Sequence, residues 1–235
     1  MNVTCIIPAA GKGSRFGGDI PKQFVHIHGK MILEYAIASL IDGLKSCHIN
    51  PSLIIACEQD RSFELQTIAQ RYLESDHIAI VQGGKERKDS IAHAVSSPLA
   101  LASDKLMIHD AARPFVPSSV IKELLEASRH TDCVIPTMPI PDTIKNVKDH
   151  CVLNTIDRSS IKLAQTPQIV DTKKYIELVH SNQHQLCTDD ASIMEYGNHT
   201  VHCINGHEMM RKITYPYDVL IAELHLSMYL NQHES

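Results

Sequence analysis

Residues 3–18 have the sequence VTCIIPAAGKGSRFGG, in which a short apolar run leads directly into a loop of small residues. The apolar run, residues 3–7, is typical of a buried strand. The glycines and alanines after it allow a backbone to approach a ligand closely and to offer its N–H groups to phosphate oxygens. Arg15 and Lys22 place two cations near the same loop. The stretch therefore predicts a strand that ends in an anion-binding loop.

The glycine spacing of this loop differs from the two best-known nucleotide-binding loops. It lacks the G-x-x-x-x-G-K-[ST] pattern of a P-loop. It is also a poor dinucleotide fingerprint, because Gly11 and Gly13 are followed by Phe16 and only then by Gly17. On glycine spacing alone, a tight strand-to-helix turn with exposed cations remains the alternative.

Short apolar runs alternate with helical patterns over the first part of the chain. This alternation predicts an α/β fold, a Rossmann-like, mostly parallel sheet flanked by helices. In such sheets the binding crevice lies at the carboxyl ends of the strands, where the loops after Ile7, Val81 and His109 emerge. We expect strands at 3–7, 53–57, 78–81, 105–109 and 133–137, and helices at 31–44, 62–73, 89–95 and 118–128.

The alternation breaks at about residues 138–157, where the sequence predicts an inserted β-hairpin. Its strands are expected at 143–147 and 152–156, with a polar turn at Lys148, Asp149 and His150. A two-stranded hairpin is marginal alone, so this arm should pack on something else, most simply a second subunit. Helices at 172–181, 189–196 and 216–230 and a strand at 200–204 complete a single domain over residues 1–235.

The composition is that of an ordinary globular protein and excludes several classes. With 22 basic and 27 acidic residues the net charge is −5, which argues against general nucleic-acid binding, and 43% apolar residues argue against disorder. The seven cysteines include no C-x-x-C pair, so we expect small, mostly buried core thiols in a reducing compartment. The fifteen histidines show no zinc spacing and are expected to lie at the surface, except His109, which stands beside Asp110 and is expected to orient that loop. No run approaches the ~18 apolar residues of a membrane span, and the first residues predict a strand rather than a signal peptide, so we expect a cytoplasmic protein.

Several further blocks, taken with the glycine-rich loop and residues 21–23 (PKQ), carry a family resemblance. The chain resembles the sugar-phosphate nucleotidyltransferases and, more narrowly, the 2-C-methyl-D-erythritol 4-phosphate cytidylyltransferases. The resemblance covers about residues 3–222 and implies a Rossmann-like fold. The further blocks, in the family's order, are GGKERKDS at 83–90, HDAARP at 109–114, DTIK at 142–145, DR at 157–158, QTPQ at 165–168, TDDAS at 188–192 and KITYPYD at 212–218.

The resemblance implies that a polyol phosphate attacks the α-phosphorus of CTP and releases pyrophosphate. The attacking oxygen is already anionic, so neither a protein base nor a protein nucleophile is needed. Such a site should be rich in cations and backbone N–H groups, with a carboxylate for Mg²⁺. The resemblance also implies a homodimer in which the hairpin arm of one subunit completes the site of the other.

Site roles follow from the same resemblance, and each has a plainer structural alternative. Asp110 could instead cap a helix or pair with Arg113, Ser90 could cap the helix after it, and Thr143 and Arg158 could be ordinary strand and surface residues. The implied catalytic residues are Arg15, Lys22 and Lys212; the implied CTP-binding residues are Ala9, Ala10, Gly11, Gly13, Gly84, Lys85, Ser90, Asp110, Ala111 and Arg113; the implied acceptor-binding residues are Thr143, Arg158 and Thr166; and the implied Mg²⁺ ligand is Asp110.

The sequence departs from the family pattern next to Lys212. Met210 and Arg211 stand where the family usually has Asn-Ile, so Arg211 could share the role of Lys212. We favour Lys212, because Ile213 and Thr214 fix the register. The chain also lacks the Trp that commonly precedes the QTPQ block, which bears on packing near the acceptor.

Three other functions compete with this interpretation. A ribitol 5-phosphate cytidylyltransferase would share the fold, the mechanism and most blocks. A non-catalytic nucleotide-binding regulator on the same fold would have less reason to carry Arg15, Lys22, Asp110 and Lys212 together. An NAD-linked dehydrogenase would need the full glycine fingerprint and a ribose-binding acid, which the sequence lacks.

Overall fold

The core is a mixed sheet whose central strands are parallel, seen in a computed structural model that describes residues 1–11, 13, 16–17, 20–181 and 187–233. β1 (Val3–Pro8) lies between β4 (Ser52–Cys57) and β6 (Lys105–Ile108), and β5 (Ile78–Gln82) pairs with β4, all in parallel. The predicted α/β class and parallel core are therefore confirmed.

The other half of the sheet contains antiparallel pairs that the sequence did not predict. β11 (Gln168–Asp171) runs antiparallel between β6 and β7 (Cys133–Pro139). β10 (Lys162–Ala164) also pairs antiparallel with β7, and β12 (Val201–Asn205) pairs with β7 in parallel. β10 and β11 are three and four residues long, too short to show a period.

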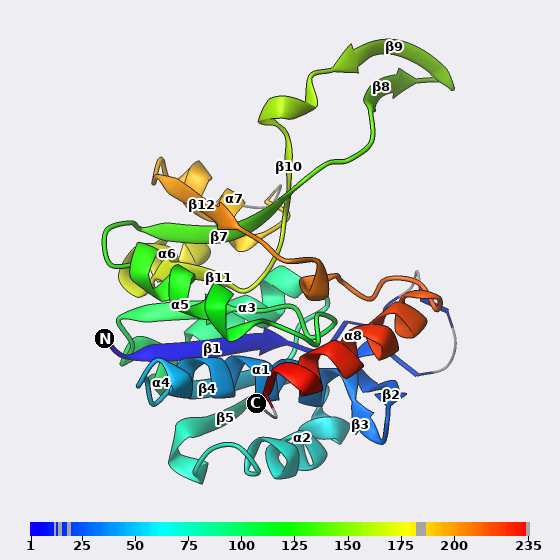
Figure 1. Cartoon of the computed structure of the whole chain (residues 1–235). Helices are drawn as coiled ribbons and strands as arrows, with labels where there is room; N and C mark the ends of the chain where they lie inside the picture. Colours follow the sequence, from blue (N-terminus) through cyan, green and yellow to red (C-terminus); the bar gives the residue numbers. More distant parts are fainter. Residues whose placement is uncertain (12, 14–15, 18–19, 182–186, 234–235) are drawn as a thin grey trace.

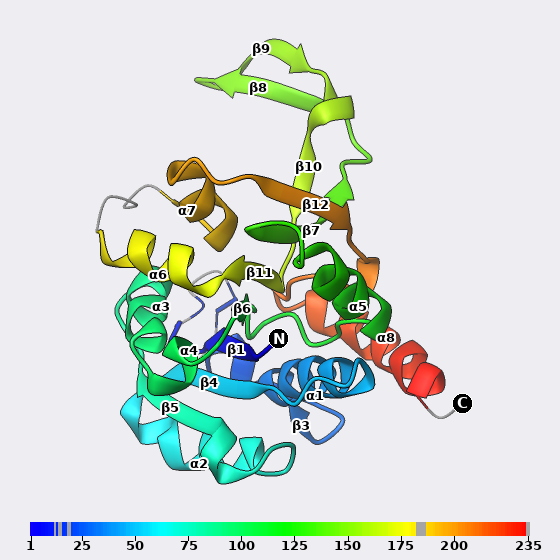
Figure 2. The same ribbon diagram turned by 90° about the vertical axis from the view of Figure 1, so that its left-hand side faces the viewer.

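Helices cover both faces of this sheet (Figure 2). α1 (Ile32–Ser46) and α5 (Ser118–Ala127) pack together on one face. Side chains alternate along β1, so that Cys5 and Ile7 join one core cluster and Ile6 the other. The opposite face carries α3 (Arg87–Val95), α4 (Pro98–Leu101), α6 (Thr172–His180) and α7 (Asp190–Tyr196).

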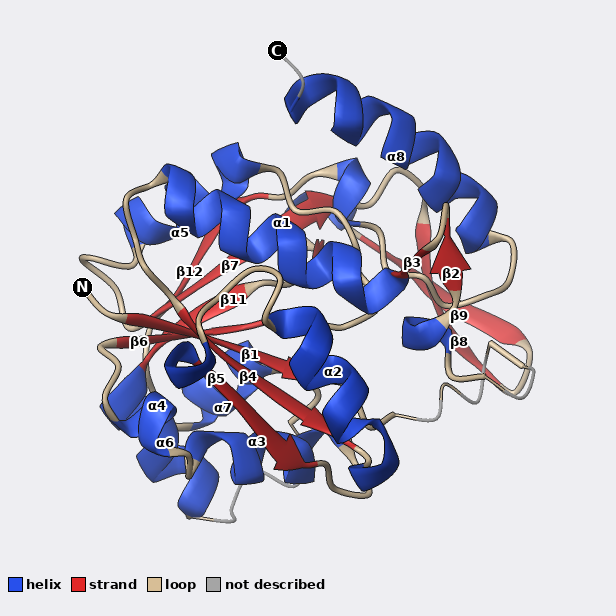
Figure 3. Cartoon of the chain, turned by 90° about the horizontal axis from the view of Figure 1, so that it is seen from below, coloured by secondary structure: helices blue, strands red, loops and turns tan. Residues whose placement is uncertain are grey.

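The remaining elements lie around the edges of the sheet. α2 (Ser62–Ala69) packs beside β5, and α8 (Asp218–His233) packs near the small hairpin of β2 (His26–Ile27) and β3 (Lys30–Met31). Seen from below, β1, β4 and β5 point toward the same edge (Figure 3). The 3₁₀ helices are η1 (Lys22–Phe24), η2 (Gln59–Arg61), η3 (Ser75–His77), η4 (Arg158–Ser160) and η5 (Glu208–Met210).

The hairpin of β8 (Ile144–Lys148) and β9 (Cys151–Ile156) projects from the body of the molecule (Figure 1). Its turn residues Asp149 and His150 have φ values of 49° and 63°, as a two-residue type I′ turn requires. The apolar side chains of Val147, Val152 and Leu153 on this arm are exposed.

Several predicted helix ends and the expected burial of the cysteines were partly wrong. Helix α1 ends at Ser46 rather than residue 44, and helix α3 begins at Arg87 rather than residue 89. Helix α2 ends at Ala69 rather than residue 73, because residues 70–73 continue as turns. Helix α8 begins at Asp218 rather than residue 216. Cys5, Cys57 and Cys133 are buried as expected, but Cys151 and Cys203 are exposed because the arm and the edge strand β12 leave them uncovered. Among the described residues, no helix is both long enough and apolar enough to cross a bilayer.

Candidate active site

A cavity of about 180 Å³ opens at the carboxyl ends of β1, β5 and β6. Loops that are far apart in the sequence line it, as expected for a parallel sheet. Arg15 lies outside the described residues, and Ala9, Arg113, Thr143, Arg158 and Thr166 do not line this cavity. The predicted residues that line it are Ala10, Gly11, Gly13, Lys22, Gly84, Lys85, Ser90, Asp110, Ala111 and Lys212.

The glycine-rich loop is held in place by Gln23, a buried residue of the PKQ block for which no role was predicted. Its side-chain amide donates to the carbonyls of Ala9 and Gly11, at 2.7 and 2.8 Å. Gly13 has a φ of +63°, which glycine adopts without strain. A Cβ at Gly13 would lie only 3.5 Å from the Lys22 side chain, so the loop and this lysine are adjacent.

The loop after β5 packs directly against the glycine-rich loop. A Cβ at Gly83 would lie 2.2 Å from the Cβ of Ala10, so this close approach requires glycine. The Gly84 N–H donates to the Ser90 hydroxyl at 3.0 Å. Glu86 forms the N-terminal cap of α3, which means that Ser90 stabilises the Gly84 loop rather than the helix end.

Asp110 is surrounded by three cationic side chains. Lys212 Nζ lies 2.8 Å from Oδ2, Arg87 Nε 3.3 Å from Oδ1, and Arg113 Nε 3.5 Å from Oδ2. Burial alone would raise the pKa of Asp110, but Arg87, Lys212 and Arg113 together lower it well below its usual range. The carboxylate is therefore ionised whenever the protein is folded near neutral pH.

A hydrogen-bonded chain behind Asp110 fixes its backbone. The Asp110 N–H donates to the Thr166 hydroxyl at 3.0 Å, and that hydroxyl lies 3.1 Å from His109 Nδ1. His109 Nε2 lies 2.9 Å from the Arg113 carbonyl, so Nε2 carries the proton and Nδ1 accepts from Thr166. Burial lowers the pKa of His109 to about 4, which keeps the imidazole neutral. Thr166 is buried here, and its predicted contact with the acceptor stays a prediction.

Lys212 and Arg211 point to different surroundings. Lys212 reaches Asp110 in the cavity, whereas Arg211 Nε lies 3.2 Å from Asp218 Oδ1 and its side chain is 53% exposed. Lys22 Nζ donates to the carbonyl of Ile213, the residue after Lys212, at 2.7 Å. The structure thus brings Lys22 and Lys212 to one cavity and places Arg211 outside it.

Asp218 holds the segment that carries Lys212, and we expect its removal to destabilise the protein. The buried carboxylate accepts from the N–H groups of Thr214 and Tyr215, both at 2.8 Å, and from Arg211. Asp218→Asn should lower the free energy of unfolding by about 2 kcal/mol at pH 7, measured by urea denaturation. Glu123→Gln, on the exposed face of α5, should change it by less than about 0.5 kcal/mol.

The loss of stability caused by Asp218→Asn should disappear in acid. Burial alone would raise the pKa of Asp218, but the two backbone N–H groups and Arg211 lower that pKa below its ordinary value. A depressed carboxyl pKa contributes stability that is complete above the unfolded value and disappears as the pH falls through the folded value. The difference between wild type and Asp218→Asn should therefore shrink below about pH 4, near the ordinary pKa of an aspartate, and a constant difference would contradict this account.

The predicted acceptor residues Thr143 and Arg158 lie at the base of the arm. Both are exposed, and Arg158 donates to the Pro141 carbonyl. Because neither lines the cavity, a single chain does not bring them together with Lys22 and Asp110.

Asp110 is also the candidate metal ligand. Among the described residues, no group of three or more His, Cys, Asp or Glu side chains is arranged to hold a metal ion by itself. An ionised carboxylate on the cavity wall nevertheless fits Mg²⁺, which takes one or two carboxylates and completes its shell with phosphates and water.

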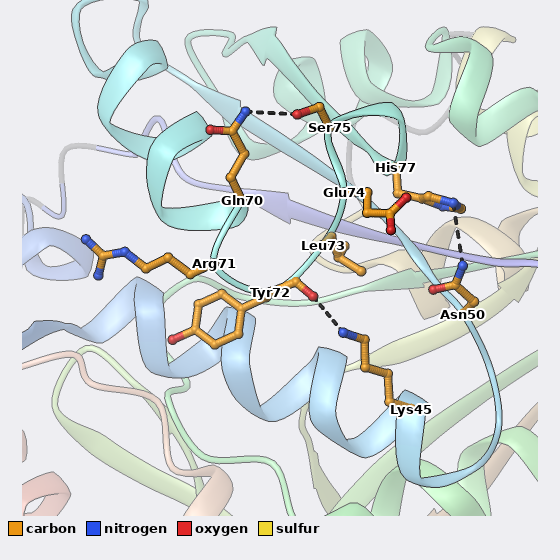
Figure 4. Close-up of a pocket in the computed structure, with 9 residues that line it drawn as sticks. All are labelled: Lys45, Asn50, Gln70, Arg71, Tyr72, Leu73, Glu74, Ser75 and His77. Carbon is orange, nitrogen blue, oxygen red and sulfur yellow. Dashed lines mark hydrogen bonds between the residues drawn. The ribbon is translucent and has the colours of Figure 1, made fainter.

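A second hollow, of about 640 Å³, lies beside the end of α1 and the turns after α2 (Figure 4). Several of its polar groups bond to one another: Lys45 donates to the Tyr72 carbonyl, Gln70 to Ser75, and Asn50 lies near His77. None of the residues predicted for the site lines this hollow.

Arg87 is a further site residue without a role in the sequence analysis. It lines the cavity and contacts Asp110. Its block, GGKERKDS, was recognised, but an arginine on a helix is most often a surface charge, and only the fold shows its carboxylate contacts.

Comparisons with known proteins agree with the geometry. The sequence model of the family described as 2-C-methyl-D-erythritol 4-phosphate cytidylyltransferase matches residues 3–228. The protein of that name from Halalkalibacterium halodurans is 37% identical over 95% of this chain and 96% of its own length. A bifunctional enzyme IspD/IspF from Granulibacter bethesdensis is 35% identical over 97% of this chain, which spans 57% of that relative. The crystal structure of the cytidylyltransferase from Thermus thermophilus has a TM-score of 0.76 at 25% identity, covering 97% of this chain and 100% of that one.

Proposed function

The chain belongs to the 2-C-methyl-D-erythritol 4-phosphate cytidylyltransferase family, and we propose from this that it transfers CMP from CTP to 2-C-methyl-D-erythritol 4-phosphate. The products are 4-diphosphocytidyl-2-C-methyl-D-erythritol and pyrophosphate, a step in isoprenoid precursor synthesis. The observation that carries the proposal is the convergence of Lys22, Asp110 and Lys212 on one cavity lined by two glycine-rich loops.

The geometry suits a displacement at phosphorus. The acceptor phosphate attacks the α-phosphorus, one P–O bond forms, and the bond to the pyrophosphate leaving group breaks. Lys22 and Lys212, which both line the cavity, stabilise the charge that develops on the phosphate oxygens. The loops around Gly11 and Gly84 bring backbone N–H groups to the nucleotide, and the closely packed turn at Gly83 favours a pyrimidine over a larger purine.

We propose that the enzyme uses Mg²⁺ and that Asp110 holds it. When bound, the ion would neutralise charge on the triphosphate. Lys212, which lies against Asp110 Oδ2, is on a flexible side chain and can turn from the carboxylate to a phosphate oxygen.

We further propose a homodimer in which the arm of one subunit supplies Thr143 and Arg158 to the site of the other. Supporting this, the arm is a projecting hairpin with exposed apolar residues Val147, Val152 and Leu153, and neither polar residue reaches the cavity of its own chain. The free thiols of all seven cysteines suit the cytoplasm, where we propose that the protein acts.

Mixed dimers test the arm directly. Arg158→Ala and Lys22→Ala should each be nearly inactive alone. If the arm acts on the other subunit, an equal mixture that has exchanged subunits should recover about a quarter of the wild-type activity, because half of the dimers then contain one intact site. The same mixture should stay inactive if the arm serves its own subunit. A mixture of Arg158→Ala and Thr143→Ala, which are both arm variants, is the matched control and should restore no activity.

The decisive assay is pyrophosphate release from CTP with a panel of polyol phosphates. Release with 2-C-methyl-D-erythritol 4-phosphate and little release with ribitol 5-phosphate is expected. Activity with ribitol 5-phosphate alone would replace the proposed acceptor. CTP binding without release with any acceptor would show a nucleotide-binding regulator instead.

A further inference from the structure

Arg87 bridges two carboxylates that come from different parts of the chain. Its Nε lies 3.3 Å from Asp110 Oδ1, and its two terminal nitrogens lie 3.2 and 2.6 Å from the oxygens of Asp190. It lines both the catalytic cavity and a smaller space of about 130 Å³, which Asp190 also lines. Arg87 thus forms part of the wall between the site and the body of the protein.

Asp190 is a buried anchor for this arginine. It is fully buried at the first residue of α7, and it accepts a hydrogen bond from the hydroxyl of Tyr175, itself buried, at 2.5 Å. Gln168 of β11 accepts from the Ala191 N–H at 2.8 Å and so ties this end of α7 to the sheet. Because it is buried and hydrogen-bonded to these partners, the Asp190 carboxylate is held in one orientation.

The bidentate pair with Asp190 limits what Arg87 can do at Asp110. Each terminal nitrogen donates to one oxygen of Asp190, and Nε is the nitrogen that donates to Asp110. Arg87 can therefore orient one oxygen of Asp110 without taking the whole carboxylate. Lys212, at the other oxygen, is a single flexible amine on a side chain that is 35% exposed and can leave.

We propose that Arg87, held by Asp190 and Tyr175, is a positioning residue that presents the carboxylate of Asp110 to the cation–triphosphate complex. The inference rests on the proposed function and extends it to two residues, Asp190 and Tyr175, that do not line the catalytic cavity. Without the charge of Asp190, the guanidinium would be uncompensated, would turn its fork toward Asp110 and would compete there with a metal ion.

The test compares Asp190→Asn with a matched carboxylate elsewhere. Glu34 has the same kind of environment: it is buried, with Arg71 at 3.0 Å and the Tyr72 hydroxyl at 3.2 Å, and it does not line the cavity. Asp190→Asn should lower kcat about tenfold to a hundredfold, in the range seen when a group supporting a metal ligand is removed. Glu34→Gln should lower stability in thermal unfolding without changing kcat.

A binding measurement separates this inference from the proposed reaction. The dissociation constant of CTP is measured by calorimetry with Mg²⁺ and with EDTA. The Mg²⁺ ratio is the dissociation constant in EDTA divided by the dissociation constant in Mg²⁺. This ratio should fall about tenfold in Asp190→Asn and stay at the wild-type level in Glu34→Gln. If the wild type binds CTP but releases no pyrophosphate, the proposed reaction fails while this ratio still tests the role of Arg87.

Two further variants keep the test valid if Asp190→Asn does not fold. Tyr175→Phe, with Tyr72→Phe as its control, should change the same ratio in the same direction by a smaller factor. The double variant Arg87→Met with Asp190→Asn leaves no uncompensated charge between them and should fold, because neutral replacement of a buried pair is often tolerated. An unchanged Mg²⁺ ratio and unchanged kcat in either folded variant would show that the network only stabilises the fold and would overturn the proposal.

Discussion

Lys22→Ala should lower kcat by about a hundredfold to a thousandfold while the protein stays folded. Lys22 lines the cavity, and its Nζ lies 2.7 Å from the Ile213 carbonyl, on the segment that carries Lys212. Its ammonium group is therefore placed where charge develops on the reacting phosphate. Its side chain is partly exposed rather than part of the core, so the loss should appear in turnover and not in the unfolding temperature.

Lys45→Ala is the matched control for this prediction. Lys45 is also a lysine that donates to a backbone carbonyl at 2.7 Å, that of Tyr72, but it lies outside the catalytic cavity. Its removal should change turnover by less than about twofold. Near-normal kcat in Lys22→Ala, measured by pyrophosphate release at saturating CTP, would contradict the assignment of this cavity as the active site.

Lys212→Ala should lower turnover nearly as much as Lys22→Ala does, whereas Arg211→Ala should leave turnover almost unchanged. Lys212 lies 2.8 Å from Asp110 at the cavity, and Arg211 pairs with Asp218 away from it. We expect kcat to fall about a hundredfold in Lys212→Ala and to stay within about threefold of wild type in Arg211→Ala. Arg211→Ala should instead lower stability modestly, because Asp218 loses a cationic neighbour.

The pair is informative because the two residues are adjacent and carry the same charge. If Arg211→Ala lost turnover as severely as Lys212→Ala, the two cations would share the role at phosphate. A conservative Lys212→Arg variant adds a second check. A planar fork does not replace a point charge at this position, so it should restore only part of the activity.

The sequence alone determined the elements that depend on neighbours in the chain. Apolar runs of four to six residues give strands β1, β4, β5 and β6, and the amphipathic period gives α1 and α5, because burial of one face is a local requirement. The hairpin turn at Asp149 and His150 was also predicted from the sequence, because a polar turn between two short β-like runs is a local pattern. The family blocks further indicated which loops meet at the site.

Contacts between distant segments were decided by the tertiary structure. Arg87 and Asp190 are 103 residues apart, and Asp110 and Lys212 are 102 apart, so no local pattern connects them. Which of two adjacent cations, Arg211 or Lys212, faces the cavity depends on how that segment is attached to its neighbours. The short antiparallel strand β11 likewise exists because β6 and β7 offer it hydrogen bonds on both sides. Periodicity determines which face of an element is buried. The charge network around Asp110 depends instead on the register of the whole sheet. The reason is that the packing of the completed fold, and not the order of residues, sets the distances between side chains.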